Sequence, residues 1–417
     1  MINVKILLSI FLISLSVYGK IGITQDNDTL RDLVIFNQDS AIAVGFIGGN
    51  IAKTQNGGHT WRLQETPTNE RINSIFFINR IGWAVGDEGV LLKSTNWGDE
   101  WIALGRKFTD AYIQSIFFID EQSGWAVSQN GKIFHTNDAG ISWFKQYSQT
   151  SDHLNSVFFL NDRTGFIVGG AWPSKSSVIL KTVNSGQTWT TVYDKWQAPI
   201  CDIFFINDST GWAVGDESII LKTNDLGQTW KVQQSPVWET FLSTFFLNEQ
   251  NGFVVGSNGA ILKTVDGGET WLINSYRETD NQFNSIKFVD QNVGWVVGTF
   301  GHIQKTVDCG NEWMLQNIQT NVLDIQNENK PNYILLKNYP NPFNSSTNIV
   351  FEISNDCEVK INIYNVSGIQ VESILKEIKS AGMHSINWTP NKLPSGIYIC
   401  HVTAGDFHGI QKMVLLE

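Results

Sequence analysis

One unit of sequence recurs seven times between Ala41 and Trp313. Each copy has an apolar segment, a Gly-aromatic segment such as GWAVG at 82–86, a segment like ILKT at 220–223, and a turn that ends in tryptophan. The apolar segments show little alternation, as in sheets covered on both faces. Four short strands per 40 to 46 residues is the period of a propeller blade, and seven blades can close into a ring around a channel. The repeats therefore predict an all-β fold with a seven-bladed β-propeller.

The turn before each tryptophan has the pattern Ser/Thr-x-Asp/Asn-x-Gly-x-x-Trp. We expect the Asp or Asn oxygen to accept backbone N–H groups, the glycine to adopt a positive φ, and the indole to pack between sheets. Because the pattern is uniform around the ring, a scaffold role is favoured over the alternative of metal or substrate sites. The predicted structural residues are Asn56 and Trp61, Asn96 and Trp101, Asp138 and Trp143, Asn184 and Trp189, Asp225 and Trp230, Asp266 and Trp271, and Asp308 and Trp313.

These turns resemble the Asp-box, or BNR, repeat of sialidase-type propellers. Together with the Gly-Trp segment, the units over about residues 32–318 resemble the seven-bladed propellers of the photosystem II assembly and stability factor family. Asp-box propellers include sialidases, xyloglucan-cleaving enzymes and non-catalytic binding proteins. The resemblance therefore implies the fold and leaves the function open.

The chain is predicted to contain four parts. Residues 1–19 have the pattern of a signal peptide, with Lys5 followed by an apolar run that is too short to span a bilayer, so no transmembrane segment is expected in the mature chain. The propeller occupies 20–318, and a polar, asparagine-rich linker occupies 319–333. Alternating strand-like segments in 334–417 predict a small immunoglobulin-like β-sandwich.

Four motifs in the last domain resemble the type A sorting domain of the bacterial type IX secretion system. They are NYPNPFN at 338–344, IYNVSG at 363–368, LPSGIY at 393–398 and KMVLLE at 412–417. The resemblance implies that the outer-membrane secretion machinery is a partner, and that the protein reaches the cell surface or the medium through the periplasm. An adhesive sandwich module is the alternative, and cleavage of the domain is left open.

Composition excludes some functions. A net charge of −11 and a pI near 5.1 argue against a nucleic-acid partner, because phosphate binding needs a basic face. His59, His135, His153 and His302 lie in different repeats without ligand spacing, so we expect no metal and no cofactor. Cys201 and Cys309 are expected to be small buried residues, whereas Cys357 and Cys400 could form a disulfide. The lysine that precedes most boxes is expected to extend to solvent at the rim.

Three tryptophans belong to neither the boxes, the Gly-Trp segments nor the last domain. Trp172, Trp196 and Trp238 fall in connections on the face opposite the Asp boxes. We hypothesise that they form an aromatic platform for a protein or glycan ligand. The alternative is that they are loop residues folded down between blades.

The sequence thus favours a secreted or cell-surface, non-catalytic binding or assembly scaffold. The alternative is an extracellular glycoside hydrolase, sialidase-like or xyloglucanase-like, with Asp87-Glu88 and Asp216-Glu217 as its carboxylates. Both pairs also suit tight turns. Arg71, Arg106 and Arg277 could serve a sialidase, but the Phe/Tyr-Arg-Ile-Pro signature of that family is absent.

Overall fold

The computed structural model describes residues 29–104, 109, 111–171, 175–276, 281–316, 318–319, 335–353, 356–366, 369–380, 382–391, 393–404 and 407–416. The predicted signal peptide and nearly all of the predicted linker lie outside these residues. The chain divides after Val322 into two compact units.

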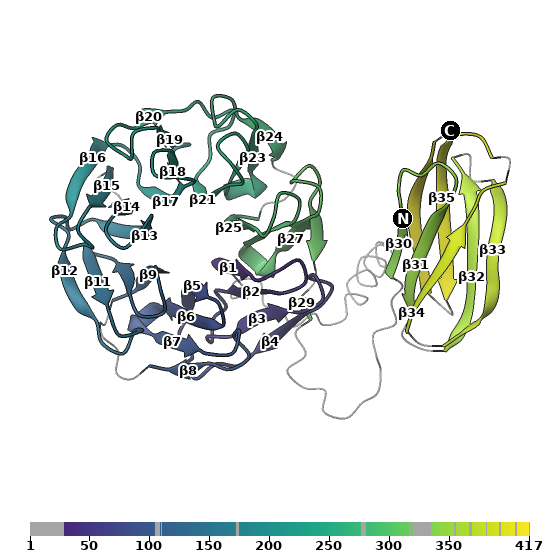
Figure 1. Ribbon diagram of the computed structural model, residues 1–417, viewed down its shortest axis with the longest axis horizontal. Coiled ribbons are helices and arrows are strands. Elements are labelled where there is room, and N and C mark those ends of the chain that lie inside the picture. Colours follow the sequence, from purple (N-terminus) through teal and green to yellow (C-terminus); the bar gives the residue numbers. More distant parts are fainter. Residues whose placement is uncertain are drawn as a thin grey trace, which may run out of the picture. The chain divides into compact units, whose positions relative to one another are not determined.

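The first unit contains seven sheets arranged in a ring (Figure 1), so the predicted seven-bladed propeller is confirmed. Each blade has four antiparallel strands, with the first strand innermost. Blades one to four comprise β1 (Asp32–Ile35), β2 (Ala41–Val44), β3 (Ile51–Thr54) and β4 (Trp61–Gln64); β5 (Ile72–Ile78), β6 (Ile81–Gly86), β7 (Leu91–Ser94) and β8 (Ile102–Ala103); β9 (Ile113–Phe118), β10 (Gly124–Ser128), β11 (Lys132–Thr136) and β12 (Phe144–Tyr147); and β13 (His153–Phe159), β14 (Gly165–Ala171), β15 (Ser176–Thr182) and β16 (Thr190–Trp196).

Blades five to seven have the same order of strands. They comprise β17 (Ile200–Phe205), β18 (Gly211–Gly215), β19 (Ile220–Thr223) and β20 (Lys231–Val232); β21 (Phe241–Phe246), β22 (Gly252–Gly256), β23 (Ile261–Thr264) and β24 (Leu272–Ser275); and β25 (Phe283–Phe288), β26 (Gly294–Gly298), β27 (Ile303–Thr306) and β28 (Met314–Gln316). Short 3-10 turns, η1 (Asp87–Gly89), η2 (Ser257–Gly259) and η3 (Thr299–Gly301), join the second and third strands of blades two, six and seven.

Aromatic contacts join most blades to the next. In blades two, three and five the tryptophan of the Gly-Trp segment stacks on a phenylalanine at the end of the next blade's first strand; the Trp212 and Phe246 rings are 3.4 Å apart. The box tryptophan of that next blade then meets the same phenylalanine edge-on, as Trp271 meets Phe246 at 6.0 Å. Glycine opens the second strand because the ring needs the space: a Cβ at Gly211 would lie 2.6 Å from the Phe205 ring. Truncating a ring buried this way costs about 3–5 kcal/mol.

Lysines also join neighbouring blades, and their predicted extension to solvent is wrong. The Nζ of a third-strand lysine donates to a box carbonyl of the next blade, at 2.7–3.2 Å, in five seams: Lys53 to Trp97, Lys93 to Ala139, Lys181 to Leu226, Lys263 to Cys309 and Lys305 to Gly57. In four of these five seams, and also at Lys222, the ammonium lies over an aromatic ring of its own blade. Each acceptor residue has a left-handed backbone, with φ of 58–71°.

The remaining two seams use other donors. Between blades five and six, Trp212 Nε1 donates to the Gly267 carbonyl at 3.1 Å, and Lys222 pairs with Glu269 at 3.2 Å. Between blades three and four the lysine is replaced by His135, which stacks on Trp125 at 4.6 Å. There Gln146 Nε2 donates to the Ser185 carbonyl at 3.1 Å.

The ring closes through contacts between its two ends. A short strand, β29 (Ile318–Gln319), pairs in parallel with β4, so the first blade has a fifth strand at its outer edge (Figure 1). At the inner edge, Leu30 N donates to Gly298 O of blade seven at 2.9 Å. Each blade keeps its own four strands, and this latch adds to them. The edge strand considered for residues 21–24 lies outside the described residues.

The second unit is a small β-sandwich, as predicted. One sheet contains β30 (Leu335–Tyr339), β31 (Thr347–Ile353) and β34 (Gly382–Trp388). The other contains β32 (Cys357–Asn365), β33 (Gln370–Lys379), β35 (Gly396–Ala404) and β36 (Phe407–Leu415). Trp388 fills the core between Phe343 and Tyr398.

The four cysteines are free. Cys400 pairs across the sheet with Ile363, six residues along β32 from Cys357. At about 3.3 Å per residue this is roughly 20 Å, too far for a disulfide, so that alternative is wrong. The prediction that Cys201 and Cys309 are fully buried is also wrong, because both are half-buried. Cys201 lies on the channel side of blade five, and Cys309 holds the left-handed position of the seventh box, with φ of 60°.

Lys305→Met should destabilise the propeller. Lys305 Nζ donates to Gly57 O at 2.8 Å and to Gln38 O at 3.0 Å, so it ties blade seven to blade one. Losing charge-assisted bonds in this half-buried place should lower the free energy of unfolding by about 1–3 kcal/mol. Urea denaturation measures the change. Lys231→Met, at an exposed lysine of β20, is the matched control, and an equal loss in both variants would contradict the seam.

Candidate functional site

The central channel is lined by side chains from all seven first strands. It encloses about 390 Å³, within the roughly 300–1,000 Å³ of ligand pockets. In blades two to seven the strand carries a β-bulge, so two successive residues can turn toward the channel. The bulged residues are Asn73, Gln114, Asn155, Cys201, Leu242 and Asn284, and Arg31 lines the channel in the first blade. Burial raises the pKa of the Cys201 thiol, which disfavours a reactive thiolate.

Two carboxylates lie in the next layer of the channel, among serines. Asp32 accepts from Ser285 Oγ of blade seven at 3.1 Å and from Ile75 N of blade two at 3.1 Å. Asp202 likewise accepts from Ser156 Oγ of blade four at 3.0 Å and from Thr244 N of blade six at 3.0 Å. Burial raises the pKa of Asp32, and nearby Lys287 opposes that rise. These carboxylates cross-link three blades each, and the polar layer is thereby held in place.

The third layer is aromatic. Five phenylalanines occupy the same position in blades two to six and line the channel half-buried: Phe76, Phe117, Phe158, Phe204 and Phe245. Neighbouring rings are 4.8–5.9 Å apart between centroids. We call these five residues the phenylalanine collar. The same position holds Val34 in blade one and Lys287 in blade seven. The sequence analysis did not predict this collar. The Phe-Phe pair that recurs in blades two to six is the sequence pattern that could have indicated it.

A second hollow lies on the face that carries the loops between blades. It measures about 400 Å³ and is lined by Asp216, Glu217, Trp238, Glu239, Thr240 and Ser257. These residues come from the turn after β18, the loop before β21 and η2, so the structure shows the predicted grouping of such connections on one face. The box turns instead contact the turns between first and second strands, as Gly57 N contacts Asp39 O.

Trp238 stands out of this cleft because its neighbours are fixed. Val237 packs against the core, and its carbonyl accepts from Ser218 Oγ at 2.9 Å. Glu239 is 8% exposed, and its carboxylate accepts from Tyr276 Oη, Ser257 Oγ and Asn258 Nδ2 at 2.8–2.9 Å. With both neighbours held, the indole between them is 74% exposed. The backbone around Trp238 is therefore held in place, and the exposed ring offers aromatic area to a ligand.

The structure brings together some of the residues considered from the sequence. Trp238 shares the cleft with Asp216 and Glu217, which had been assigned to competing hypotheses. Trp172 lies outside the described residues. Trp196 ends β16 opposite Ser176, and its side chain lies outside the description. The three-tryptophan platform therefore stays a hypothesis, with Trp238 its described member.

The second acidic pair lies elsewhere, in the turn after β6. Asp87 accepts from Asn73 Nδ2 at 2.8 Å, and its N–H donates to Arg71 O. Glu88 has φ of 53°, and Glu217 has φ of 52°. Asn258 and Phe300 hold the same left-handed position in η2 and η3. Since unlike side chains share this turn, its geometry does not require a carboxylate. Arg106 and Arg277 lie outside the described residues.

The seven box residues make one repeated turn. In every box the Asp or Asn Oδ1 accepts the backbone N–H four residues later, at 2.8–3.0 Å. The hydroxyl at the start of the box accepts the N–H of the following glycine, as in Thr223 with Gly227 at 2.9 Å. The side-chain oxygens of the boxes thus accept hydrogen bonds from their own turn, which supports the predicted scaffold role.

Three box aspartates have lowered pKa values because hydroxyls donate to them. The Thr229 hydroxyl, with the Thr229 N–H, lowers the pKa of Asp225 from 3.8 to about 2. Ser142 lowers the pKa of Asp138, and Thr270 lowers that of Asp266, in the same way. In two of the asparagine boxes the amide donates to the hydroxyl instead: Asn56 Nδ2 to Thr60 at 2.9 Å and Asn184 Nδ2 to Thr188 at 3.0 Å.

Comparison with known proteins adds to this geometry. Residues 106–200 and 232–323 match the family described as photosynthesis system II assembly factor YCF48, and residues 337–416 match the secretion system C-terminal sorting domain. The chain is a YCF48-like propeller with a secretion-system sorting domain. A sorting domain of this kind implies engagement with the type IX machinery and secretion or attachment at the cell surface.

Individual relatives of this YCF48-like propeller are distant. The chloroplastic photosystem II stability/assembly factor HCF136 of Oryza sativa subsp. japonica is 32% identical over 119 residues, 25% of this chain and 28% of that protein. The photosystem II assembly lipoprotein Ycf48 of Synechococcus sp. (strain CC9902) is 33% identical over 110 residues, 24% of this chain and 32% of that protein. The chain thus aligns with less than a third of each relative's length.

A solved structure supports the fold of the YCF48-like propeller. YCF48 bound to D1 peptide superposes with a TM-score of 0.57 and 21% identity, over 68% of this chain and 92% of that one. At this identity the likeness shows the fold alone.

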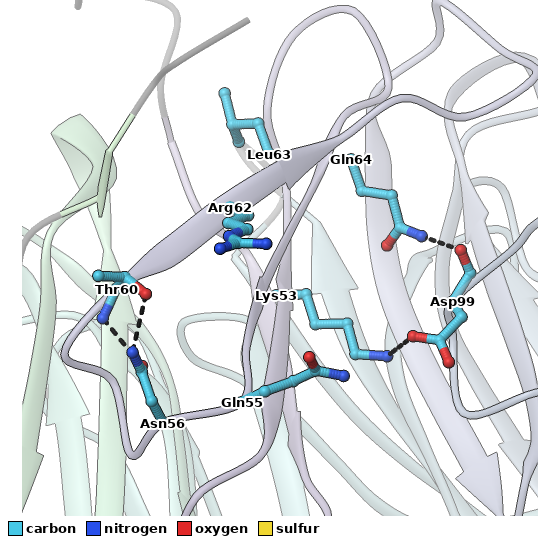
Figure 2. Close-up of a pocket in the computed structure, with 8 residues that line it drawn as sticks. All are labelled: Lys53, Gln55, Asn56, Thr60, Arg62, Leu63, Gln64 and Asp99. Atoms are coloured by element: carbon cyan, nitrogen blue, oxygen red, sulfur yellow. Dashed lines mark hydrogen bonds and ion pairs between the residues drawn. The ribbon is translucent and has the colours of Figure 1, made fainter. Parts of the chain in front are cut away.

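A third hollow on the YCF48-like propeller, of about 360 Å³, is the outer side of a seam. Lys53 and Gln64 both point to Asp99 of blade two (Figure 2): Lys53 Nζ pairs with its carboxylate at 2.5 Å, and Gln64 Nε2 donates to its carbonyl. Asn56 donates to Thr60 Oγ1 at 2.9 Å, within the first box. Lys53, Gln64 and Asp99 therefore hold blades one and two together.

Two further features of the described residues bear on function. Within them, no three His, Cys, Asp or Glu side chains gather in a way that could hold a metal ion. No helix in the same part of the chain has the length and apolarity needed to cross a membrane.

Replacing Asp138, Asp225 and Asp266 by asparagine should flatten the acid dependence of stability. A lowered folded-state pKa contributes stability above the unfolded pKa near 3.8, and this is lost as pH falls toward about 2. The triple variant should still fold at pH 7, because three native boxes carry asparagine at this position and form the same turn. Thermal melts from pH 5 to pH 2 measure this. An unchanged slope would contradict it.

Proposed function

We propose that the protein is a secreted or cell-surface binding scaffold that holds a protein or glycan ligand on the loop face of its propeller, without catalysing a reaction. The observation behind this proposal is Trp238, whose indole is 74% exposed between two anchored neighbours in a cleft of about 400 Å³. Tryptophan is enriched among residues that dominate binding energy. Holding the backbone on both sides of the ring in place also reduces the entropy lost on association.

Two comparisons support binding as the function. The relatives carry names of assembly factors, and a propeller of the same fold was solved with a peptide bound. A photosystem role does not transfer with the fold, since the aligned parts cover less than a third of the relatives. For this protein we infer only the general function of a binding scaffold.

A glycosidase remains the second candidate because of one observation. Asp216 and Glu217 share the cleft with Glu239, so several carboxyl groups line one hollow. Two properties weigh against it. Glu217 forms an ion pair with Lys175 at 2.8 Å, and Glu239 accepts three hydrogen bonds that fix both of its oxygens. Such carboxylates serve the structure of the cleft, whereas a general acid must exchange its proton with a substrate.

Trp238→Ala should abolish most ligand retention. Purified protein is incubated with the outer surface of native cells and with a glycan array, and retained molecules are quantified by mass spectrometry and fluorescence. We expect at least a roughly tenfold loss in Trp238→Ala, since a central aromatic is worth 2 kcal/mol or more. Tyr147→Ala is the matched control, because Tyr147 is 79% exposed on an outer strand. Equal retention by both variants would refute the loop-face site.

Hydrolysis of a panel of reporter glycosides should not exceed that of a blank. The panel includes sialosides and xyloglucan oligosaccharides, assayed between pH 4 and pH 8. The opposite result, turnover by the parent protein that disappears in Asp216→Asn, would establish the glycosidase and overturn the proposal.

A further inference from the structure

The phenylalanine collar is not required by the fold. In blades two to six the last, turn-proximal part of the first strand contains a pair of adjacent phenylalanines. The second of each pair packs within the blade and against its neighbours, as Phe246 stacks on Trp212 at 3.4 Å. The first of each pair faces the channel. Blades one and seven hold Val34 and Lys287 at that place and keep the same four-stranded sheet.

Five half-buried phenyl rings around one channel form an unusual apolar surface. The rings come from five consecutive blades, and each touches its neighbours at 4.8–5.9 Å between centroids. They line a cavity of about 390 Å³ and leave part of their area open to it. Covering aromatic area by an apolar ligand is favourable at roughly 25 cal/mol per Å². The collar therefore suits one bulky apolar group.

One cation stands at the level of the collar. Lys287 replaces the phenylalanine of blade seven, and in the part of the chain that the structure describes its ammonium group forms no hydrogen bond or ion pair. It is near enough to Asp32 to lower that carboxyl's pKa, while Asp32 is itself bound by Ser74, Ile75 and Ser285. An anionic group of a ligand beside the collar would meet this ammonium.

The polar layers next to the phenylalanine collar indicate that the ligand of the channel is a peptide and not an acyl chain. They contain hydroxyl and amide side chains, such as Ser115 and Gln114, around the same channel. The Gln114 amide makes no side-chain hydrogen bond among the described residues, so a donor and an acceptor remain for a ligand. A hydrocarbon chain would leave these groups unsatisfied, whereas the amides of a peptide would pair with them.

We propose that the channel binds an extended segment of a partner protein that carries a bulky apolar side chain next to a carboxylate. The apolar side chain enters the phenylalanine collar, the carboxylate pairs with Lys287, and the peptide amides meet the polar layers. This names a ligand class and a second site for the binding function proposed above, on which it rests.

A peptide selection tests this proposal. The full chain is immobilised and offered a phage-displayed library of random nonapeptides, and the best binders are synthesised with fluorescein for anisotropy measurements. The selected sequences should pair Phe, Trp, Tyr, Leu or Ile with an adjacent Asp or Glu. Failure to enrich any peptide, or enrichment without an acidic residue, would overturn the proposal.

Variants then locate the site. Phe117→Val, Phe158→Val and Phe204→Val are combined, with valine chosen because Val34 shows that the fold accepts it. The selected peptides should bind this variant at least roughly tenfold more weakly, a change of about 1.4 kcal/mol. Lys287→Gln should remove most of the preference for peptides with Glu over matched peptides with Gln, and affinity for the Gln peptides should stay within about twofold. Unchanged affinity in both variants would overturn the channel site.

Trp238→Ala separates this proposal from the loop-face site. Selected peptides should bind Trp238→Ala as they bind the parent chain if the channel alone holds them. Loss in Trp238→Ala with full binding in the collar variant would leave the loop-face function standing and refute the channel. Urea denaturation of each variant confirms that the ring is intact, and a collar variant that is unfolded is replaced by Phe158→Val alone.

Discussion

The contact between neighbouring blades is what the whole propeller depends on. A four-stranded sheet with apolar residues on both faces cannot shield itself, so its stability comes from the sheets on either side. At most seams a cation lies over an aromatic ring of its own blade and donates to a left-handed carbonyl of the next box. The carbonyl is free to accept because the box turn bends it away from strand pairing. The lysine of one blade and the box turn of the next blade therefore act together to join the two blades.

The same strand that builds the seams also builds the channel. Successive side chains of a strand point to opposite sides, so adjacent residues of the first strand have separate roles. The second phenylalanine of the pair fills the seam under a glycine, and the first faces the central cavity. The first phenylalanine also packs partly against the seam, as Phe158 does against the cluster around Phe205, yet its position accepts other residues. Val34 and Lys287 are examples within the chain itself.

Much of the fold could be predicted because it is repeated. Seven tryptophan-closed units fixed the number of blades, and alternating segments after residue 334 indicated the sandwich. Contacts across blades were harder. The partner of Lys93 lies 46 residues away, in the next blade, so no local pattern reveals it. The latch β29 has two residues and no periodicity to detect. Glu239 reaches the cleft only because Ser218 and Tyr276, from other segments, hold it there.

One seam differs in kind from the rest. Between blades three and four an imidazole stands where lysine is found in other blades, and an amide supplies the donor to the Ser185 carbonyl. A neutral donor gains less from a carbonyl than an ammonium does, and salt scarcely screens it. The seams between blades therefore differ in how strongly their stability depends on salt concentration. A rise in ionic strength should weaken the ammonium contacts of the other seams, whereas the contact between Gln146 and Ser185 should keep its strength. An exported propeller therefore has one seam whose hydrogen bond between blades involves no charge.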